Sequence, residues 1–201
     1  MRISLRTVVC VPRPNREQPS GFFHVVSRGV DGRKVFDGDE TRLLYFHLLA
    51  KTVRARAVKC HRYCLMDNHV HLVLETAEEG QLGQALQLLN SAYACAFNEI
   101  VGRRGYLFER PYTSKRLVGE SHTLECCRYV DLNPVRAGMR ERAEQYAWSS
   151  YRATVGLARV PLFLTMDWAL GLFDEDGRRA RTRYAAFVDD GARRPRPLDM
   201  Y

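Results

Sequence analysis

The sequence has no apolar run long enough to cross a membrane. A membrane-spanning helix needs about 20 consecutive apolar residues, and no stretch of the 201 residues approaches that length. The segment from Met1 to Cys10 has too short an apolar stretch, and no small-residue cleavage site, for a secretory signal. We therefore predict a cytoplasmic protein without membrane contact.

Paired cysteine motifs are also missing. The six cysteines stand at positions 10, 60, 64, 95, 126 and 127, and no two have the spacing of a C-x-x-C knuckle. This spacing suggests neither a zinc ribbon nor a disulfide framework. We expect reduced thiols, buried or partly buried, in a reducing compartment.

Lysine is scarce among the basic residues, and acidic residues are outnumbered. Lys and Arg together number 31 against 23 Asp and Glu, which gives a net charge of +8, and arginine far outnumbers lysine. A guanidinium group can contact a phosphate through two hydrogen bonds. Such a surplus is typical of proteins that bind nucleic acids, and it also occurs in basic proteins with other functions.

Hydrophobic periodicity predicts a domain that mixes strands and helices. The predicted elements are strands at 21–27, 58–66 and 69–75, an extended segment at 106–118, and helices at 39–56, 81–101, 121–133, 165–173 and 178–188. Asp39 and Ser121 are the expected N-caps of two helices, and Leu43 is expected on the buried side of the first. This order favours an α+β fold, an antiparallel sheet with helices packed on one face.

Composition divides the chain into four parts. We expect an irregular arm at 1–20, a main domain at 21–155, a helical extension at 156–190, and a basic tail without fixed structure at 191–201.

Two histidines stand on one face of the predicted strand at 69–75. Successive strand side chains point to opposite faces, so Val70, Leu72 and Leu74 form one apolar row while His69 and His71 share the other face. We expect helices to cover the apolar row and to leave the histidines on an open face. Two such imidazoles can chelate one ion. With 6 histidines in the chain, about 0.2 such pairs are expected by chance, so the pair alone is a weak signal.

A second group of polar residues follows on the predicted helix at 121–133. Residues four apart share a helical face, so Tyr129 and Asn133 point together, close to the point where Pro134 ends the helix. The alternative is a buried tyrosine followed by an Asn-Pro helix stop, which is a common arrangement. If this helix lies across the histidine face, the two groups form one site.

Taken in order, these residues resemble the REP-associated tyrosine transposases, part of the HUH single-tyrosine transposase superfamily. The resemblance covers roughly residues 11–155 and rests on five segments, which are PRP (12–14), FHVVSRG (23–29), YCLMDNHVHL (63–72), YVDLNPVRAGM (129–139) and WSSY (148–151). The HUH strand and the NPVRAG stretch are its specific parts. The first ten residues precede it, and we expect Val11 to be the native start.

The resemblance implies a role for each matching residue. His69 and His71 would hold Mg²⁺ or Mn²⁺ with Asn133 as third ligand, and Tyr129 would be the nucleophile that nicks and transfers single-stranded DNA. The implied substrate is DNA folded into the hairpins of repetitive extragenic palindromes, bound by a monomer or a homodimer in the nucleoid. Glu75 shares the histidine face and is a candidate to orient a ligand.

Basic residues along the chain are the expected phosphate contacts. They are Arg13, Arg28, Arg103, Arg104, Lys115, Arg116 and Arg136. The run Phe108 to Tyr112 departs from the family's aromatic-Gln-Gly-Arg-Phe pattern, which puts the DNA contact of that segment in question. Two alternatives stay open: a domesticated, non-catalytic protein that binds DNA hairpins, and an RNA-binding sheet module.

Overall fold

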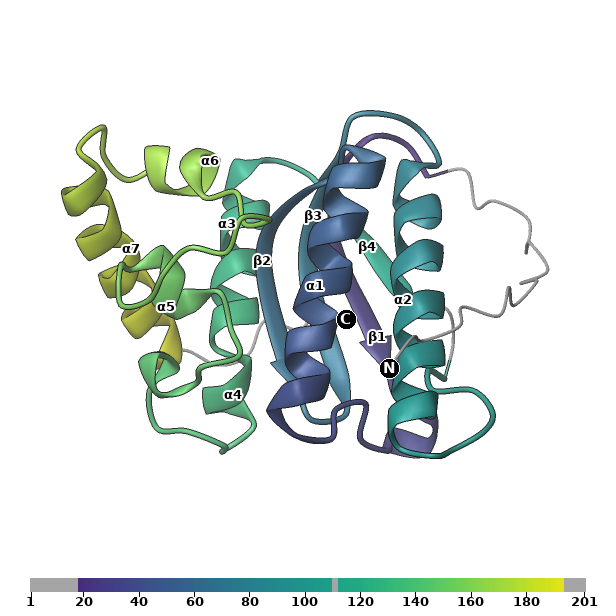
Figure 1. Cartoon of the computed structure of the whole chain (residues 1–201). Helices are drawn as coiled ribbons and strands as arrows, with labels where there is room; N and C mark the ends of the chain where they lie inside the picture. The colour runs from purple at the N-terminus through teal and green to yellow at the C-terminus, as the bar shows by residue number, and fades with distance from the viewer. Residues whose placement is uncertain (1–17, 110–111, 194–201) are drawn as a thin grey trace.

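The structure is a computed structural model that describes residues 18–109 and 112–193 of the chain (Figure 1). In these residues the elements follow one another as β1 (Gly21–Arg28), η1 (Val30–Gly32), α1 (Gly38–Arg56), β2 (Lys59–Met66), β3 (His69–Thr76), α2 (Gln81–Ile100), β4 (Thr113–Leu117), α3 (Glu120–Asp131), α4 (Asn133–Arg136), η2 (Ala143–Gln145), α5 (Tyr151–Thr154), α6 (Asp167–Gly171) and α7 (Gly177–Ala192).

One sheet, with strand order β2-β3-β1-β4, lies at the centre of the described chain. Every neighbouring pair is antiparallel, so the α+β class and the antiparallel sheet are confirmed. The histidine strand β3 is an interior strand because β2 and β1 flank it. Asp67 and Asn68 make the two-residue turn from β2 to β3, and Arg42 of α1 pairs with the Asp67 carboxylate at 2.5 Å. The histidines therefore lie on an interior strand, directly after a turn that is bonded to α1.

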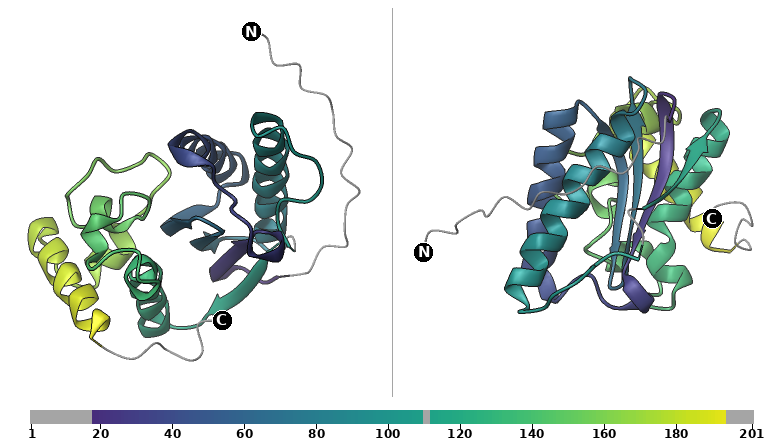
Figure 2. Two further views of the ribbon diagram at one scale, coloured as in Figure 1. Left: turned by 90° about the horizontal axis from the view of Figure 1, so that it is seen from below. Right: turned by 90° about the vertical axis from the view of Figure 1, so that its right-hand side faces the viewer.

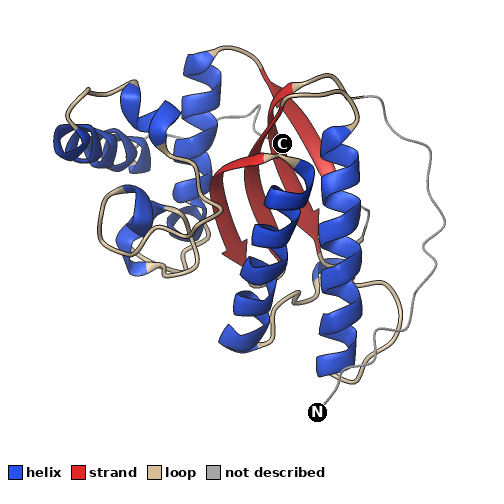
Figure 3. Ribbon diagram, turned by 45° about the horizontal axis from the view of Figure 1, so that its top comes forward, coloured by secondary structure: helices blue, strands red, loops and turns tan. Residues whose placement is uncertain are grey.

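The apolar row of β3 faces the main core. Val70, Leu72 and Leu74 are no more than 2% exposed, and α1 and α2 lie side by side over this face (Figure 3). The expected buried stripe of α2 is confirmed, since it comprises Leu82, Leu86, Leu89, Tyr93 and Phe97.

The beginnings of two helices differ from expectation. The N-cap of α1 is Asp37, whose backbone N–H donates to Thr41 Oγ1 at 2.8 Å, so Asp39 lies in the first turn. The register of α1 turns Leu43 outward, where it is 59% exposed. The N-cap of α3 is Gly119, which has φ 81°, a conformation that a serine cap would not adopt without strain.

The expectation of an open histidine face, with helices on one side of the sheet only, is wrong. Helix α3 packs across that face, on the side opposite α1 and α2 (Figure 2, right). The reason is a second apolar cluster in which Cys126, Cys127 and Val130 of α3 meet Met66 and Val73 of the sheet. Burying these side chains is favourable by about 25 cal/mol per Å² of apolar surface, so the helix covers the sheet.

The segments after α3 pack on the outer side of that helix. Helix α7 lies beside α3, which stands between α7 and the sheet (Figures 1 and 2). The stretch around Ser149 pairs with the outer edge of β2, where the backbone N–H of Leu65 donates to the Trp148 carbonyl at 2.9 Å. This pairing covers the edge of the sheet, which would otherwise present unpaired backbone groups.

Several expectations concern residues outside this description. Most of the arm at 1–20, including Arg13, and the tail beyond 193 lie outside the described residues. Helix α7 continues to Ala192 and so enters the segment expected to be tail. In residues 18–109 and 112–193, no helix combines the length and apolar character that membrane spanning requires.

Candidate active site

Three histidines gather on the face of the sheet that α3 covers. In the antiparallel pairing of β1 with β3, Val26 lies opposite His71 and Arg28 opposite His69, which puts His24 on the same face as both. His24 Nε2 and His71 Nδ1 are 3.0 Å apart. The rings of His69 and His71 are 4.7 Å apart between centroids and nearly perpendicular, at 82°.

Tyr129 of α3 meets this cluster from the opposite side. Its ring centroid is 5.8 Å from that of His71 and 5.7 Å from that of His24, and in both pairs the rings meet edge to face. The two groups that the sequence separates by more than fifty residues are therefore adjacent in one chain.

Asn133 lies just after the end of α3. Its Nδ2 donates to the backbone carbonyl of Tyr129 at 3.0 Å, which satisfies one of the carbonyls left over at the end of the helix. The acceptor oxygen Oδ1 takes no part in that bond. The chain resumes a helical course at α4 because Pro134 falls in its first turn, where its missing N–H costs nothing.

The proton positions of His69 and His71 are constrained by neighbours. His69 Nδ1 is 2.6 Å from Asn68 Oδ1, and the Asn68 amide is oriented by its Nδ2, which donates to the Gly32 carbonyl at 3.2 Å. An amide oxygen only accepts, so Nδ1 of His69 carries the proton. In both His69 and His71 it is Nδ1 that contacts a neighbouring side chain, so an ion would be bound through Nε2.

The donor set fits a metal ion only with oxygen ligands added. Within residues 18–109 and 112–193, no three His, Cys, Asp or Glu side chains are arranged to hold a metal together. The three histidines are therefore not a three-ligand site. Two imidazoles can still bind one ion when an amide oxygen, water and phosphate complete its coordination. Asn133, whose Nδ2 is bonded to the Tyr129 carbonyl, is the candidate for that amide oxygen through Oδ1.

Exposure differs along the cluster. His71 and Tyr129 are 1% exposed and His24 is 3% exposed, enclosed between the sheet and α3. His69 is partly exposed, and Arg28, its partner across the strands, is exposed. The cluster is therefore reached from solvent at the end of the sheet where His69 stands.

The expected phosphate-binding residues are distributed unevenly around the cluster. Arg28 stands at its rim, Lys115 is the register partner of His24 on β4, and the Arg136 guanidinium lies 5.5 Å from the centre of the Tyr129 ring. Arg116 belongs to the opposite face, by strand alternation, and its Nη2 donates to the Ser20 carbonyl at 3.2 Å.

The loop that follows α2 carries two more of these residues. Arg104 is exposed, and Arg103 Nη2 donates to the Tyr106 carbonyl at 3.2 Å. This loop returns to the sheet at Phe108, which bridges to Gly29, directly after Arg28. It therefore joins the same end of the sheet as His69.

Glu75 is bonded to residues outside the His69–His71 pair. Its two carboxylate oxygens contact Lys59 Nζ at 3.1 Å and His61 Nε2 at 2.7 Å, toward the far end of β3. Burial acts to raise the pKa of Glu75, but the hydrogen bonds from His61 and Lys59 outweigh it and lower that pKa. His24 contacts His71 instead, and sequence reasoning missed it. The signal lies in the register of β1 against β3, which no spacing within either strand reveals.

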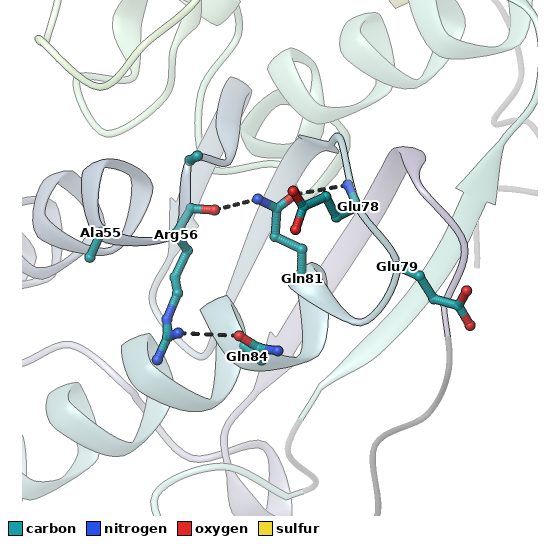
Figure 4. Close-up of a pocket in the computed structure, with 7 residues that line it drawn as sticks. Ala55, Arg56, Glu78, Glu79, Gln81 and Gln84 are labelled. Atoms are coloured by element: carbon teal, nitrogen blue, oxygen red, sulfur yellow. Dashed lines mark hydrogen bonds between the residues drawn. The ribbon is translucent and has the colours of Figure 1, made fainter.

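A separate cavity of about 290 Å³ lies between the end of α1 and the start of α2 (Figure 4). Polar groups of its lining bond to one another: Gln81 Nε2 donates to the backbone carbonyl of Arg56 at 2.5 Å, and Arg56 Nη1 donates to Gln84 Oε1 at 3.2 Å. It adjoins the Thr76 end of β3, about 23 Å along the strand from His69 at roughly 3.3 Å per residue. The cavity is therefore not part of the histidine site.

Comparison with known proteins shows the family to which the chain belongs. Residues 19–133 match the family model described as transposase IS200 like, and the match includes His69, His71, Tyr129 and Asn133. The chain belongs to the IS200-like transposase family. No curated protein matches it.

A solved structure shares the fold of this IS200-like transposase. It is that of a REP-associated tyrosine transposase bound to a REP hairpin, with a TM-score of 0.56 and 13% sequence identity. The match covers 79% of this chain and 93% of the other. At this identity the similarity establishes the fold, an antiparallel sheet of four strands with helices.

Proposed function

We propose that this protein cuts and rejoins single-stranded DNA at hairpin sequences, with Tyr129 as the nucleophile and Mg²⁺ or Mn²⁺ as cofactor. The observation that carries the proposal is the 5.8 Å approach of the Tyr129 ring to the His71 ring within one chain. Family membership supports a transposition substrate. The hairpin form of that substrate is inferred from the REP hairpin bound to the transposase that shares this fold.

We propose His69, His71 and Asn133 as the residues that hold the ion. Two imidazole nitrogens and one amide oxygen, with positions left for water and phosphate, suit Mg²⁺ or Mn²⁺ better than a structural Zn²⁺. Such an ion, when bound, would offset the negative charge by which a phosphodiester repels nucleophiles. The contacts of His69 and His71 at Nδ1 support this assignment because, with Nδ1 bonded to a neighbour, Nε2 is the ring nitrogen that would bind an ion.

Tyr129 would attack phosphorus through Oη. A free tyrosine phenol has a pKa of about 10, so the proton leaves as the bond forms. The Oη–P bond forms, the bond from phosphorus to the 3′-oxygen breaks, and that oxygen takes up a proton. The downstream DNA stays on Tyr129 through its 5′-phosphate. Because the covalent bond keeps the energy of the phosphodiester, a second 3′-hydroxyl can later displace Tyr129 and rejoin the strand.

The basic residues around the cluster would position the DNA backbone. Arg28 at the rim and Arg136 over the Tyr129 ring are best placed for phosphates beside the cut. Arg103 and Arg104 would contact phosphates further along the strand. Such contacts fix the position of the strand and carry little sequence information.

We propose that one chain is sufficient for catalysis. The 5.8 Å approach of the His71 and Tyr129 rings within one chain supports this, because the proposed mechanism then needs no catalytic group from a second subunit. A monomer is therefore the simplest active form.

The test is covalent capture of DNA. A hairpin oligonucleotide labelled at its 3′ end should become attached to the wild-type protein in Mn²⁺, and the adduct should survive a denaturing gel. A 5′ label should not become attached, because it leaves with the upstream fragment. Tyr129→Phe should abolish the adduct, whereas Tyr106→Phe, a change at an 87% exposed tyrosine, should retain it. Absence of a Tyr129-dependent adduct across a series of hairpins would refute the proposed DNA-cleaving activity.

One observation favours a second candidate, a protein that binds DNA hairpins without cutting them. Tyr129 and His71 are only 1% exposed, so the cluster is closed to a bulky substrate at its centre. This candidate predicts that hairpin affinity survives His69→Ala and Tyr129→Phe, and that the wild-type protein produces no nick.

A further inference from the structure

His24 is a buried histidine that the proposed metal site does not use. It lies on β1, is 3% exposed, and places Nε2 at 3.0 Å from Nδ1 of His71. The two rings are stacked, with an interplanar angle of 10° and centroids 5.2 Å apart. Neither the apolar cluster nor the ligand set explains why a third imidazole should occupy this position.

Only one proton can lie between His24 Nε2 and His71 Nδ1. Two neutral imidazoles can share a hydrogen bond either with His24 Nε2–H donating or with His71 Nδ1–H donating. If His71 binds an ion through Nε2, that nitrogen must present a lone pair, and the ring proton must sit on Nδ1. The donor is then His71 Nδ1–H, and His24 Nε2 is the acceptor.

We propose that His24 is a positioning residue for the metal site, which accepts the hydrogen bond of His71 Nδ1–H and thereby holds His71 in the tautomer and orientation that present Nε2 to the ion. The inference rests on the proposed function only for the identity of that ion site. Metal-binding histidines in general donate their second ring N–H to a neighbouring acceptor, which sets both tautomer and ring orientation.

The other HUH histidine has the same arrangement. His69 Nδ1 is bonded to Asn68 Oδ1 at 2.6 Å, and the orientation of the Asn68 amide is set by Gly32. Both histidines of the pair are thus bonded at Nδ1, one to an amide oxygen and one to an imidazole. The parallel supports the assignment of His24 Nε2 as an acceptor.

A role for His24 as a third ligand does not fit the structure. Its Nε2 contacts His71 Nδ1, and within the described residues the three histidines are not arranged to hold one ion. A purely space-filling role would be met by any ring of the same size. These two alternatives make different predictions from the proposal.

The first experiment needs no metal. In nitrogen-15-labelled protein, long-range correlation spectra report which ring nitrogen of each histidine carries the proton. The wild-type protein should show His71 protonated at Nδ1, and His24→Phe should lose this preference. A wild-type spectrum with His71 protonated at Nε2 overturns the proposal. This readout stays decisive whether or not the protein proves to cut DNA.

The second experiment measures affinity for Mn²⁺ alone, from the EPR signal of the free ion. Removing a partner of this kind typically weakens metal binding about 10- to 100-fold, and we expect that loss in His24→Phe. His24→Gln keeps an acceptor near the position of Nε2 and should restore most of the affinity. His61→Phe, a change at a histidine that is 1% exposed but bonded to Glu75, should leave it unchanged.

The outcomes separate the possible roles. Wild-type affinity in His24→Phe, or failure of His24→Gln to restore binding when His24→Phe has lost it, overturns the positioning role. Loss of Mn²⁺ binding in His69→Ala without any DNA adduct in the wild-type protein would instead count against the proposed function and leave the role of His24 intact.

Discussion

Replacing Tyr184 by phenylalanine should weaken a buried polar network behind α3, the helix that carries Tyr129. Tyr184 of α7 donates from Oη to Asp131 Oδ2 at 2.7 Å and accepts from Arg62 Nε at 3.0 Å. All three side chains are 0% exposed. The substitution keeps the ring and removes only the oxygen that joins Arg62 of the sheet, Asp131 of α3 and helix α7.

The expected loss follows from the bonds that disappear. Hydrogen bonds to charged groups contribute about 1.5–3 kcal/mol each, and two are lost. The ions are not left isolated, because Arg62 Nε and Asp131 Oδ2 stay 3.5 Å apart and Ser150 Oγ donates to Asp131 Oδ1 at 2.9 Å. We therefore expect the free energy of unfolding to fall by about 2–3 kcal/mol. For a protein of this size that lowers Tm by roughly 4–12 °C.

Tyr45→Phe is the matched control. Tyr45 is also 0% exposed, but its Oη has no hydrogen-bond partner among the described residues. Removing an unsatisfied buried hydroxyl should be neutral or stabilising. Urea unfolding and calorimetry of both variants measure the difference. If Tyr184→Phe costs no more than Tyr45→Phe, the network does not stabilise the fold.

Two further predictions concern pH and core packing. Burial lowers the pKa of His61 below its ordinary value of 6.5, against the opposing effect of Glu75. Unfolded His61 therefore binds a proton at higher pH than folded His61, so the free energy of unfolding should fall as the pH drops below about 6.5. Urea unfolding at a series of pH values across this range measures that dependence. The free energy of unfolding should depend less steeply on pH in His61→Phe than in the wild-type protein, and an equal dependence would contradict the argument. Leu72→Ala, at a 1% exposed core position, should lower the free energy of unfolding by about 2–5 kcal/mol. Leu162→Ala, at a fully exposed position, should change it by less than about 0.5 kcal/mol. Equal losses in the two variants would refute the assignment of Leu72 to the core.

Strand alternation made the histidine strand predictable. Val70, Leu72 and Leu74 face the core, as the period of two requires, and the buried side of α2 follows from its helical spacing. Both patterns depend on residues within one element. The sequence therefore carries the prediction without knowledge of what packs against that element.

Packing between distant elements was less predictable. Cys126 and Cys127 gave no sign that α3 would cover the histidine face, since thiols occur both in cores and near surfaces. The cap at Gly119 depends on a positive φ that a helix-propensity argument does not address. His24 was missed for a similar reason, because its role depends on the register of β1 against β3 and not on a spacing within either strand.

Some of the residues that hold the helix of Tyr129 in place lie outside the part of the chain that matches the family model. The family match ends at Asn133, yet Asp131, two residues after Tyr129, is bonded to Tyr184 of α7. The Arg128 guanidinium lies 4.3 Å from the centre of the Phe187 ring on the same helix. Thus the sheet orients the histidines, while α7 holds the outer side of α3, the helix that carries Tyr129. A substitution in α7 can therefore shift the phenol relative to the imidazoles without touching either, and Tyr184→Phe should reduce adduct formation as well as stability.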